Sequence, residues 1–318
     1  MKLGPGREFD RIRALLQRLG PDADQIGDDC AVVPDGPGSL VISADLAVEG
    51  IHFRRDWLSL EEIGWRAAAA ALSDLAAEGA RAVGLMASIG VPAEAAEDAA
   101  ADVMGGVHAA VGAVGGCVLG GDLSRSDQWV VGITVLGRAV RPVTRAGARP
   151  GDQLWVTGTL GASRAGLAAL LRGETPPPAA REAFARPKPR IASGLALARA
   201  GATALLDLSD GLGGDAGHLA AASSLGLHIQ LLQLPVAGPV LVEATRAGVP
   251  PAVFAALGGE DYELLAALPS SFGPADAAAM QRETGVALTL IGECRAGSGV
   301  QLRLGQDAIA LPGFDHFA

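Results

Sequence analysis

The sequence predicts an α/β protein of α+β character, built from two domains. Short apolar runs of strand length alternate with alanine-rich segments of helical length, and the 318-residue chain is longer than one small domain usually needs. A third observation places the boundary: residues 141–152, RPVTRAGARPGD, carry proline, glycine and charge without hydrophobic periodicity. We therefore expect an N-terminal domain over residues 1–140 and a C-terminal domain over residues 141–318.

In the N-terminal domain, helices and strands are expected in alternation. Residues 7–19 have apolar positions at helical spacing, and residues 60–79 predict an alanine-rich helix that ends at Gly79, a suitable C-cap. Residues 82–92 are apolar and short, which indicates a buried strand that Pro92 ends. The other expected elements are a strand over 39–46, a helix over 93–115, a strand and turn over 116–122 and a strand over 129–140.

In the C-terminal domain, residues 153–171 predict a strand, a glycine turn and a helix, which is the usual opening of an α/β layer. The prolines at 176–178 indicate an exposed loop. The segment LLDLSDGLGGD, residues 205–215, places three aspartates directly after an apolar strand. The other expected elements are helices over 190–200 and 214–224, a strand over 227–235, a loop and strand over 256–269 and then one helix with short strands.

Composition and charge argue against several classes of function. The formal net charge of −10 disfavours binding to nucleic acid and to an anionic membrane surface. No apolar run is long enough to span a bilayer, and the start, MKLGPGREFD, lacks the apolar segment of a signal peptide. Cys30, Cys117 and Cys294 are odd in number and widely spaced, which is typical of free thiols in a reducing cytoplasm. We expect a cytoplasmic protein without nucleic-acid or membrane partners.

Acidic residues recur at strand ends, in glycine turns and on one helix face, between apolar residues. The chain has only two lysines, Lys2 and Lys188, and both lie far from these acids in the sequence. A carboxylate beside a core is costly unless it is paired or metal-bound, so the sequence predicts Mg²⁺, which bridges carboxylates to phosphates. Each acid alone could be a turn acid or helix cap; their recurrence favours phosphate chemistry. The segments are GDDCAVV (27–33), SADLAVEGIHF (43–53), ALSDLAAEGA (71–80), LGGDLSRS (119–126), LDLSDGL (206–212) and LGGEDYELL (257–265).

Familiar motifs for other chemistries are missing from the sequence. Neither lysine has the neighbours of a phosphate-binding Walker A loop, and an EF-hand loop starting at Asp207 would need glycine where Leu212 stands. No G-x-S-x-G elbow and no H-E-x-x-H motif occurs. A non-catalytic acidic module that binds Ca²⁺ stays open as an alternative, although it gives no role to Arg145 or to the glycine turns.

The order of the motifs resembles that of the thiamine-monophosphate kinases. The motifs are GDDCAVV, DLAVEGIHF, LSDLAAEGA, LGGD, RAGARPGDQLWVTGTLGAS, LDLSDGL and GGEDYELL, and the resemblance runs from about Gly27 to GFDHF at 313–317. VEGIHF and GGEDYEL separate this family from relatives in its superfamily. Those relatives, the aminoimidazole ribonucleotide synthetases, selenophosphate synthetases and hydrogenase-maturation enzymes that use ATP, stay open as a second alternative.

The resemblance implies the two-domain aminoimidazole ribonucleotide synthetase-like fold, with the N-terminal sheets of two subunits paired in a homodimer. It implies that ATP phosphorylates thiamine monophosphate to thiamine diphosphate with several Mg²⁺ ions and no catalytic side chain. Magnesium-ligand positions fall on Asp29, Ser43, Ala44, Asp45, Asp74, Asp122, Asp207 and Asp210. ATP-contact positions fall on Met104, Gly121, Asp122, Arg145 and Ser209. Positions near the thiamine phosphate fall on His52, Glu260 and Phe314.

Three residues depart from the family pattern. Leu123 stands where threonine is usual, so a hydroxyl contact is lost. Ala44 replaces a common threonine and leaves only its backbone carbonyl as a ligand, and Met104 stands where an aromatic residue often flanks the nucleotide. These departures put individual contacts in doubt, and the order of the motifs is unaffected.

Several of these residues also have structural interpretations. Without the resemblance, His52 would be a packed core histidine, Arg145 a linker charge and Glu260 a turn cap. Phe314 is either a tail anchor or a lid on a thiamine ring. We interpret Asp215 as an acid at a helix N-terminus, and Asp28 as an Asx-turn residue or a group that supports the metal ligands.

Overall fold

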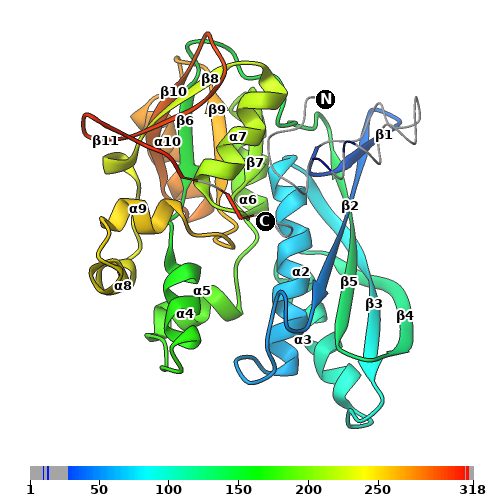
Figure 1. Cartoon of the computed structure of the whole chain (residues 1–318). Helices are drawn as coiled ribbons and strands as arrows, with labels where there is room; N and C mark the ends of the chain where they lie inside the picture. Colours follow the sequence, from blue (N-terminus) through cyan, green and yellow to red (C-terminus); the bar gives the residue numbers. More distant parts are fainter. Residues whose placement is uncertain (1–9, 11–12, 14–27, 312, 315–318) are drawn as a thin grey trace.

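The computed structural model describes residues 10, 13, 28–311 and 313–314 (Figure 1). The helix expected over residues 7–19 lies outside the described residues, apart from Asp10 and Arg13. The chain forms two sheets with helices packed against them, and helix α2 (Leu60–Ala77) lies between the two sheets.

The N-terminal sheet has five strands in the order β1-β2-β5-β3-β4. Neighbouring strands are antiparallel, except that β3 and β4 are parallel. Alternate positions of β5 are buried, among them Val131, Ile133 and Val135, as a half-covered sheet requires. The strands are β1 (Ala31–Asp35), β2 (Gly38–Val48), β3 (Arg81–Pro92), β4 (Cys117–Ser126) and β5 (Val130–Ala139).

Helix α2 begins and ends where local chemistry requires. Ser59 caps its first turn in a capping box with Glu62, and Gly79 takes a left-handed φ of 61° just after its end, as the sequence predicts. Helix α3 (Ala99–Ala113) packs closely along α2. A Cβ on Gly64 of α2 would lie 1.9 Å from a backbone oxygen of α3, so only glycine permits this approach.

The C-terminal sheet has seven strands in the order β12-β11-β8-β10-β6-β9-β7. The strands are β6 (Gln153–Thr157), β7 (Ala204–Asp207), β8 (Gly226–Gln230), β9 (Leu264–Leu268), β10 (Leu288–Arg295), β11 (Gly299–Leu304) and β12 (Asp307–Ile309). The helices are α4 (Ala162–Leu171), α5 (Pro178–Ala185), α6 (Ile191–Arg199), α7 (Leu212–Ser223), the 3₁₀ helix η2 (Leu231–Gln233), α8 (Val240–Ala247), α9 (Pro251–Ala256) and α10 (Pro274–Thr284).

Some expected elements differ from the observed ones. The segment expected as a strand and turn over 116–122 is the longer strand β4, and the helix expected from residue 93 begins only at Ala99. The exposed loop expected over 176–178 is partly wrong, because Pro176 is buried and Pro178 begins helix α5. Proline suits the first turn of a helix, where its missing N–H costs nothing.

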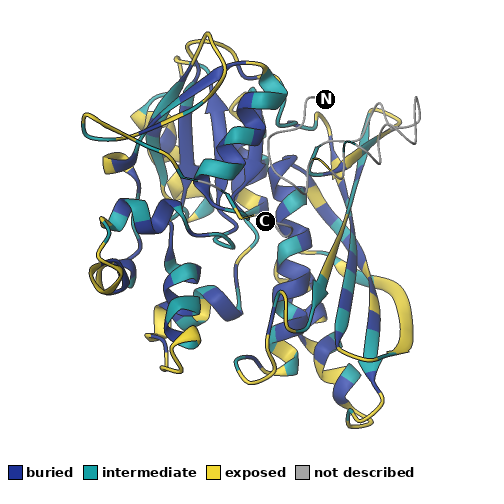
Figure 2. Ribbon diagram, in the orientation of Figure 1, coloured by how far each residue is buried: buried dark blue, intermediate teal, exposed yellow. Residues whose placement is uncertain are grey.

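The hydrophobic core continues across the connection between the sheets. One cluster of buried side chains joins Leu72 of α2 and Val135 of β5 to Leu197 and Leu205 of the C-terminal half. A second cluster lies between the C-terminal sheet and helices that include α7 and α9 (Figure 2). Because α2 packs against both halves, it holds residues of the two sheets in fixed relative positions.

The described part of the chain contains neither a helix that could span a membrane nor a disulfide. No helix there is both long and apolar enough to cross a bilayer. Cys30 and Cys294 are buried free thiols and Cys117 is an exposed one, in agreement with the expectation of free thiols.

Candidate active site

A cleft of about 1020 Å³ lies between the N-terminal sheet with α2 and the C-terminal half. It is lined by the end of β2 and the loop that follows, by α2, and by the loops after β7 and before β9. More than half of the site residues that the sequence marks line this cleft. These are Asp45, His52, Asp74, Asp207, Ser209, Asp210, Glu260 and Phe314.

One end of this cleft is acidic. Carboxylate oxygens of Asp29, Asp74 and Asp207 all lie within 4.8 Å of one another, which is close enough to share a cation. Asp207 is the last residue of β7, Asp74 is a half-buried residue of α2, and Asp29 precedes β1. The strand and helix therefore deliver these carboxylates from both halves to one point.

Strand β2 adds the hydroxyl and the carboxylate expected from it. Ser43 Oγ donates a hydrogen bond of 2.5 Å to Asp74 Oδ2. Because side chains alternate along a strand, Ser43 and Asp45 share a face and Ala44 points to the other. Asp45 lines the cleft, whereas Ala44 does not. This placement agrees with a role for Ala44 through its backbone only.

Burial and neighbouring charges raise the pKa of two carboxylates of the cluster. Burial is the main cause that raises the pKa of Asp74 well above its usual value, and the negative charges of Asp45 and Asp207 add to it. Burial and the nearby Asp29 raise the pKa of Asp207 to about 7. The cluster therefore resists carrying its full negative charge, and a bound cation would relieve that resistance.

A second group of acids adjoins the first. Oxygens of Asp28, Asp29 and Glu78 lie within 4.8 Å of one another. Arg145 pairs with Asp28 at 3.2 Å and also with Asp29, so its positive charge partly balances these two carboxylates. Burial, together with Asp28, raises the pKa of Glu78 to about 10. The sequence analysis includes Glu78 in the acidic segment 71–80 but assigns it no role as a ligand.

The aspartates of LLDLSDGLGGD have different roles. Asp207 joins the acidic cluster and Asp210 lines the cleft. Asp215, in the first turn of α7, accepts a 3.1 Å hydrogen bond from the backbone N–H of Asp210. The interpretation of Asp215 as an acid at a helix N-terminus is confirmed, and its contact fixes the loop that carries Asp210.

The GGEDYEL segment folds back onto this loop. The N–H groups of Glu260 and Tyr262 donate to the carbonyls of Ser209 and Leu208 at 2.7 and 3.0 Å. Both residues have left-handed φ angles, 61° and 50°, which non-glycine residues rarely adopt. These hydrogen bonds hold the strained backbone, which places Glu260 beside Ser209 in the cleft.

Glu260 is paired with a residue that the sequence analysis missed. Arg66, on α2, is only 5% exposed, and its guanidinium forms an ion pair with Glu260. The same guanidinium donates to the carbonyl of Phe184 and stacks 4.3 Å from the centre of that ring. Arg66 therefore fixes the position of the Glu260 carboxylate from the opposite half of the chain.

His52 and Phe314 lie at other parts of the cleft wall. The N–H of Val48 donates to His52 Nδ1 at 3.1 Å, so the neutral ring carries its proton on Nε2. Phe314 is 62% exposed, and its N–H donates to the carbonyl of Asp210 at 2.9 Å. The alternative that Phe314 anchors the tail in the core is wrong, because its ring remains largely exposed.

Three predicted residues lie away from this cluster within one chain. Gly121 and Asp122 are on the exposed strand β4, and Met104 of α3 packs against the first core cluster. A Cβ on Gly121 would lie 1.9 Å from the carbonyl oxygen of Ala87. Close pairing of β3 with β4 therefore requires this glycine, whether or not it contacts a nucleotide.

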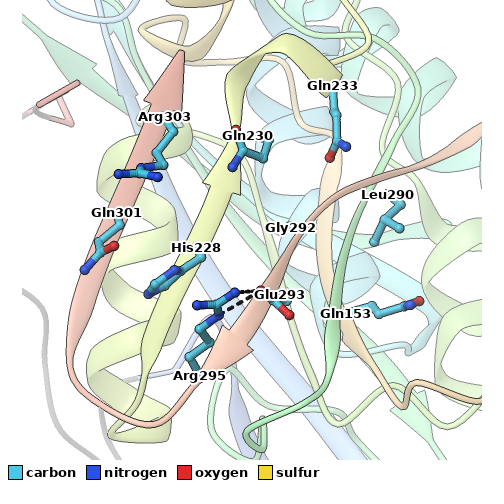
Figure 3. A pocket seen from close by; sticks show the side chains of 10 residues that line it. All are labelled: Gln153, His228, Gln230, Gln233, Leu290, Gly292, Glu293, Arg295, Gln301 and Arg303. Atoms are coloured by element: carbon cyan, nitrogen blue, oxygen red, sulfur yellow. Dashed lines mark hydrogen bonds and ion pairs between the residues drawn. The ribbon is translucent and has the colours of Figure 1, made fainter. Parts of the chain in front are cut away.

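A second hollow lies on the C-terminal sheet and has a volume of about 490 Å³. Gln153, His228, Gln301 and Arg303 of strands β6, β8 and β11 lie along it (Figure 3). None of the residues that the sequence marks as ligands or substrate contacts lines this hollow. It is separate from the candidate active site.

Known proteins share both the sequence and the fold. The AIR synthase related protein family matches with its N-terminal domain over residues 27–139 and its C-terminal domain over residues 149–305. The thiamine-monophosphate kinase of Halobacterium salinarum is 38% identical over 307 residues, which cover 96% of this chain and 99% of that protein. The thiamine-monophosphate kinase of Mycobacterium tuberculosis is 38% identical over 253 residues, 78% of this chain and 74% of that protein.

Solved structures agree with this relationship. AaThiL complexed with AMPPCP and TMP superposes with a TM-score of 0.87 at 31% identity, covering 98% of this chain and 97% of that one. Hydrogenase maturation protein HypE in complex with ATP has a TM-score of 0.72 at 19% identity, covering 98% and 96%, and this likeness shows the fold alone. The chain therefore belongs to the AIR synthase related protein family and, within it, to the thiamine-monophosphate kinases.

Proposed function

We propose that this protein transfers the γ-phosphate of ATP to thiamine monophosphate, giving thiamine diphosphate and ADP. The observation that carries the proposal is the meeting of carboxylates from both halves of the chain at one end of the cleft. The kinase relatives, and the neighbour solved with the ATP analogue AMPPCP, support the same reaction.

The acidic cluster fits Mg²⁺. It offers hard oxygen ligands, and Asp29 Oδ2 is buried without a hydrogen-bond partner among the described residues. When bound, Mg²⁺ neutralises phosphate charge and helps to align the two phosphate groups. The proposed ligands are Asp29, Ser43, the carbonyl of Ala44, Asp45, Asp74, Asp207 and Asp210.

The side chains of the cleft bind and orient the substrates. The acceptor phosphate oxygen is already a competent nucleophile at neutral pH, so in-line transfer needs no general base. His52, through its Nε2–H, and Glu260, held by Arg66, are proposed to position thiamine monophosphate. Phe314 is proposed to cover the thiamine ring. The proposed ATP contacts are Met104, Gly121, Asp122, Arg145 and Ser209.

Asp122 reaches the cluster only if a second copy supplies it. Across the sheet, Asp45 pairs with Ile133, Ile133 with Ala87 and Ala87 with Gly121, so Asp122 lies about 14 Å from Asp45 at the spacing of sheet strands. We propose a homodimer in which β4 of one copy lies beside β2 of the other, which brings Asp122 next to Asp45.

Two sheet edges support this pairing. In the described part of the chain, β1 pairs with β2 only up to Ile42, so Ser43 to Val48 have no strand neighbour on that side. The outer edge of β4 also has no neighbour there, and most of this strand is exposed (Figure 2). Leu119 and Leu123 on β4 are 50% and 64% exposed. Long exposed edges pair readily with another chain.

We also propose that residues 1–140 form a domain that carries the metal and ATP site and the dimer interface, and that residues 141–318 form a domain that completes the active site. We propose further that the protein works in the cytoplasm. The free thiols Cys30, Cys117 and Cys294 suit a reducing compartment.

The first experiment measures ADP formation from ATP and Mg²⁺ with thiamine monophosphate, with thiamine, or with neither. Turnover only with the monophosphate, yielding thiamine diphosphate, supports the proposal. Asp74→Asn should lower kcat by about 100-fold or more, because it removes the charge of a proposed metal ligand whose carboxylate accepts a hydrogen bond from Ser43. The control is Asp98→Asn, since Asp98 is exposed and makes no capping bond at α3; it should keep full activity.

Other outcomes point to the alternatives. ATP consumption with none of these acceptors would contradict the choice of acceptor and favour a related ATP-using enzyme. Binding of Ca²⁺ without nucleotide dependence and without turnover would favour a non-catalytic cation-binding module.

A further inference from the structure

Glu78 forms a buried acidic pocket with Asp28 and Asp29, next to the proposed magnesium ligands. Its side chain is fully buried at the end of α2, and its carboxylate oxygens come within 4.8 Å of those of Asp28 and Asp29. Neither the sequence motifs nor the proposed transfer step gives Glu78 a role.

The oxygens of this pocket divide into two sets. Asp28 Oδ1 accepts from the N–H of Asp29 at 3.0 Å and from the N–H of Arg145 at 3.2 Å, and the Arg145 guanidinium pairs with Asp28 Oδ1 and Asp29 Oδ1. Four oxygens remain: Oδ2 of Asp28, Oδ2 of Asp29 and both oxygens of Glu78. All four are buried, and within the described ranges the one donor that acts on any of them is the backbone N–H of Cys30, which interacts with the Glu78 carboxylate.

The pocket also carries an excess of negative charge. Three carboxylates face one guanidinium, which leaves two negative charges when all are ionised. Glu78 also caps the C-terminus of α2, where the helix dipole disfavours an acid. Burying unpaired carboxylates is costly, so a ligand of charge +2 is the simplest partner for this set.

We propose that Asp28, Asp29 and Glu78 form a further site for a divalent cation, which shares Asp29 with the proposed magnesium cluster. Its hard, all-oxygen donors suit Mg²⁺, Mn²⁺ or Ca²⁺. Cys30, although adjacent in sequence, does not offer a thiolate, because burial raises the pKa of its thiol far above its usual value. The cation would hold the start of β1, the end of α2 and Arg145 together behind the cleft.

The direct test counts bound Mn²⁺ per chain at equilibrium, without nucleotide, by electron paramagnetic resonance. Glu78→Gln keeps the shape of the side chain and should bind one Mn²⁺ fewer than the wild type. The matched control is Glu243→Gln, since Glu243 is also buried but pairs with Arg172 away from the acidic groups; its count should equal the wild type. An unchanged count in Glu78→Gln overturns the proposal.

Thermal unfolding provides a second readout. In a chelator, Glu78→Gln should melt at a higher temperature than the wild type, because it removes buried charge, and Mn²⁺ should then stabilise it less. Equal Mn²⁺-induced shifts in the two proteins would mean that Glu78 is a protonated carboxyl without a cation. If Glu78→Gln does not fold, as judged by circular dichroism, Asp28→Asn takes its place with the same expectations.

These measurements do not depend on the kinase reaction, because Mn²⁺ is counted without substrates. A protein that fails to phosphorylate thiamine monophosphate but loses one Mn²⁺ on Glu78→Gln would support this site and contradict the proposed function. A protein that phosphorylates thiamine monophosphate but binds the same number of Mn²⁺ ions after Glu78→Gln would support the proposed function and contradict this site.

Discussion

At the scale of single residues, buried charge determines the site. Burial raises the pKa of the carboxyl groups of Asp74 and Asp207. Arg66 is a buried cation and Arg145 a half-buried one, and each pairs with an acid across the two halves of the chain. Such pairs rarely add stability over apolar residues, but they specify position. Some acids of the site therefore lack a cationic partner in the chain, whereas Glu260 pairs with the guanidinium of Arg66.

The acidic cluster predicts how stability changes with pH. The folded pKa of Asp207, about 7, lies above its ordinary value of 3.8, so the folded state holds the proton more tightly than the unfolded chain. This stabilisation is complete below about pH 4 and is lost as pH rises through about 7. In a chelator, the melting temperature should therefore fall by about 4 °C or more between about pH 5 and pH 8.

Added Mg²⁺ should reverse this fall, because it binds the ionised carboxylates more strongly at high pH. Calorimetry across this pH range, with chelator or with Mg²⁺, measures both effects. Asp207→Asn should flatten the profile in chelator. A melting temperature in chelator that rises steadily with pH would contradict the mutual repulsion of these carboxylates.

Arg66 predicts a defect in substrate binding. Arg66→Lys keeps the charge but cannot pair with Glu260, donate to Phe184 and stack on its ring in one geometry. We expect the KM for thiamine monophosphate to rise about tenfold, with a smaller change in kcat and in the KM for ATP. Steady-state kinetics with each substrate varied in turn separates these effects. Equal changes in both KM values would point to a general loss of structure.

At the scale of elements, backbone contacts between loops position the side chains of the cleft. The loop after β7, the strained segment 257–262 and the C-terminal tail are joined through backbone hydrogen bonds of Leu208, Ser209 and Asp210. The tail also crosses the start of α7, where a Cβ on Gly213 would lie 2.3 Å from the carbonyl oxygen of Leu311. Gly213, and Gly214 beside it, therefore allow the tail to reach the cleft.

Gly214 provides a test of this arrangement. A Cβ at this position would lie 2.7 Å from Gly313 Cα, so Gly214→Ala should displace the tail and with it Phe314. We expect a KM for thiamine monophosphate that is raised several-fold and an unchanged KM for ATP. Gly112→Ala is the control, because this helical glycine of α3 has open space around it and alanine should stabilise the helix by about 0.5–1 kcal/mol.

Truncation after Leu311 should reproduce the kinetic effect of Gly214→Ala if the tail covers the substrate. If Gly214→Ala leaves both KM values unchanged, Phe314 has no role in binding thiamine monophosphate.

At the scale of the whole molecule, the proposed dimer decides whether the metal site is complete. Asp45 and Asp122 lie on different edges of one sheet, so a chain lacking either should be inactive alone. Co-expressed Asp45→Asn and Asp122→Asn chains should form mixed dimers with one intact site. Random pairing makes half of the dimers mixed, so activity should return to about a quarter of the wild-type value.

Light scattering and activity assays of the co-expressed, separately tagged chains measure this recovery. Leu123→Asp, which adds charge to the exposed edge of β4, should give monomers without activity. Inactivity of the mixed dimers would contradict a site shared between two copies.

Local patterns in the sequence were sufficient for most of the regular structure. The helix that ends before Gly79 and the strands over 82–92 and 129–140 are confirmed, because periodicity and glycine or proline signals act within a few residues. The short helices α5, α8 and α9 were not predicted. Each is six or eight residues long, which is too short for a clear hydrophobic period.

The sequence by itself determined the fold class, the family and the residue types of the site, since these depend on composition, local pattern and motif order. Only the tertiary structure decided which acids meet. Asp28 lies 117 residues from Arg145 in the chain and joins it in space, while Asp122 stays apart because β4 occupies the sheet edge. Strand order and helix packing arise from contacts between distant segments, and those contacts leave no periodic signal in the chain.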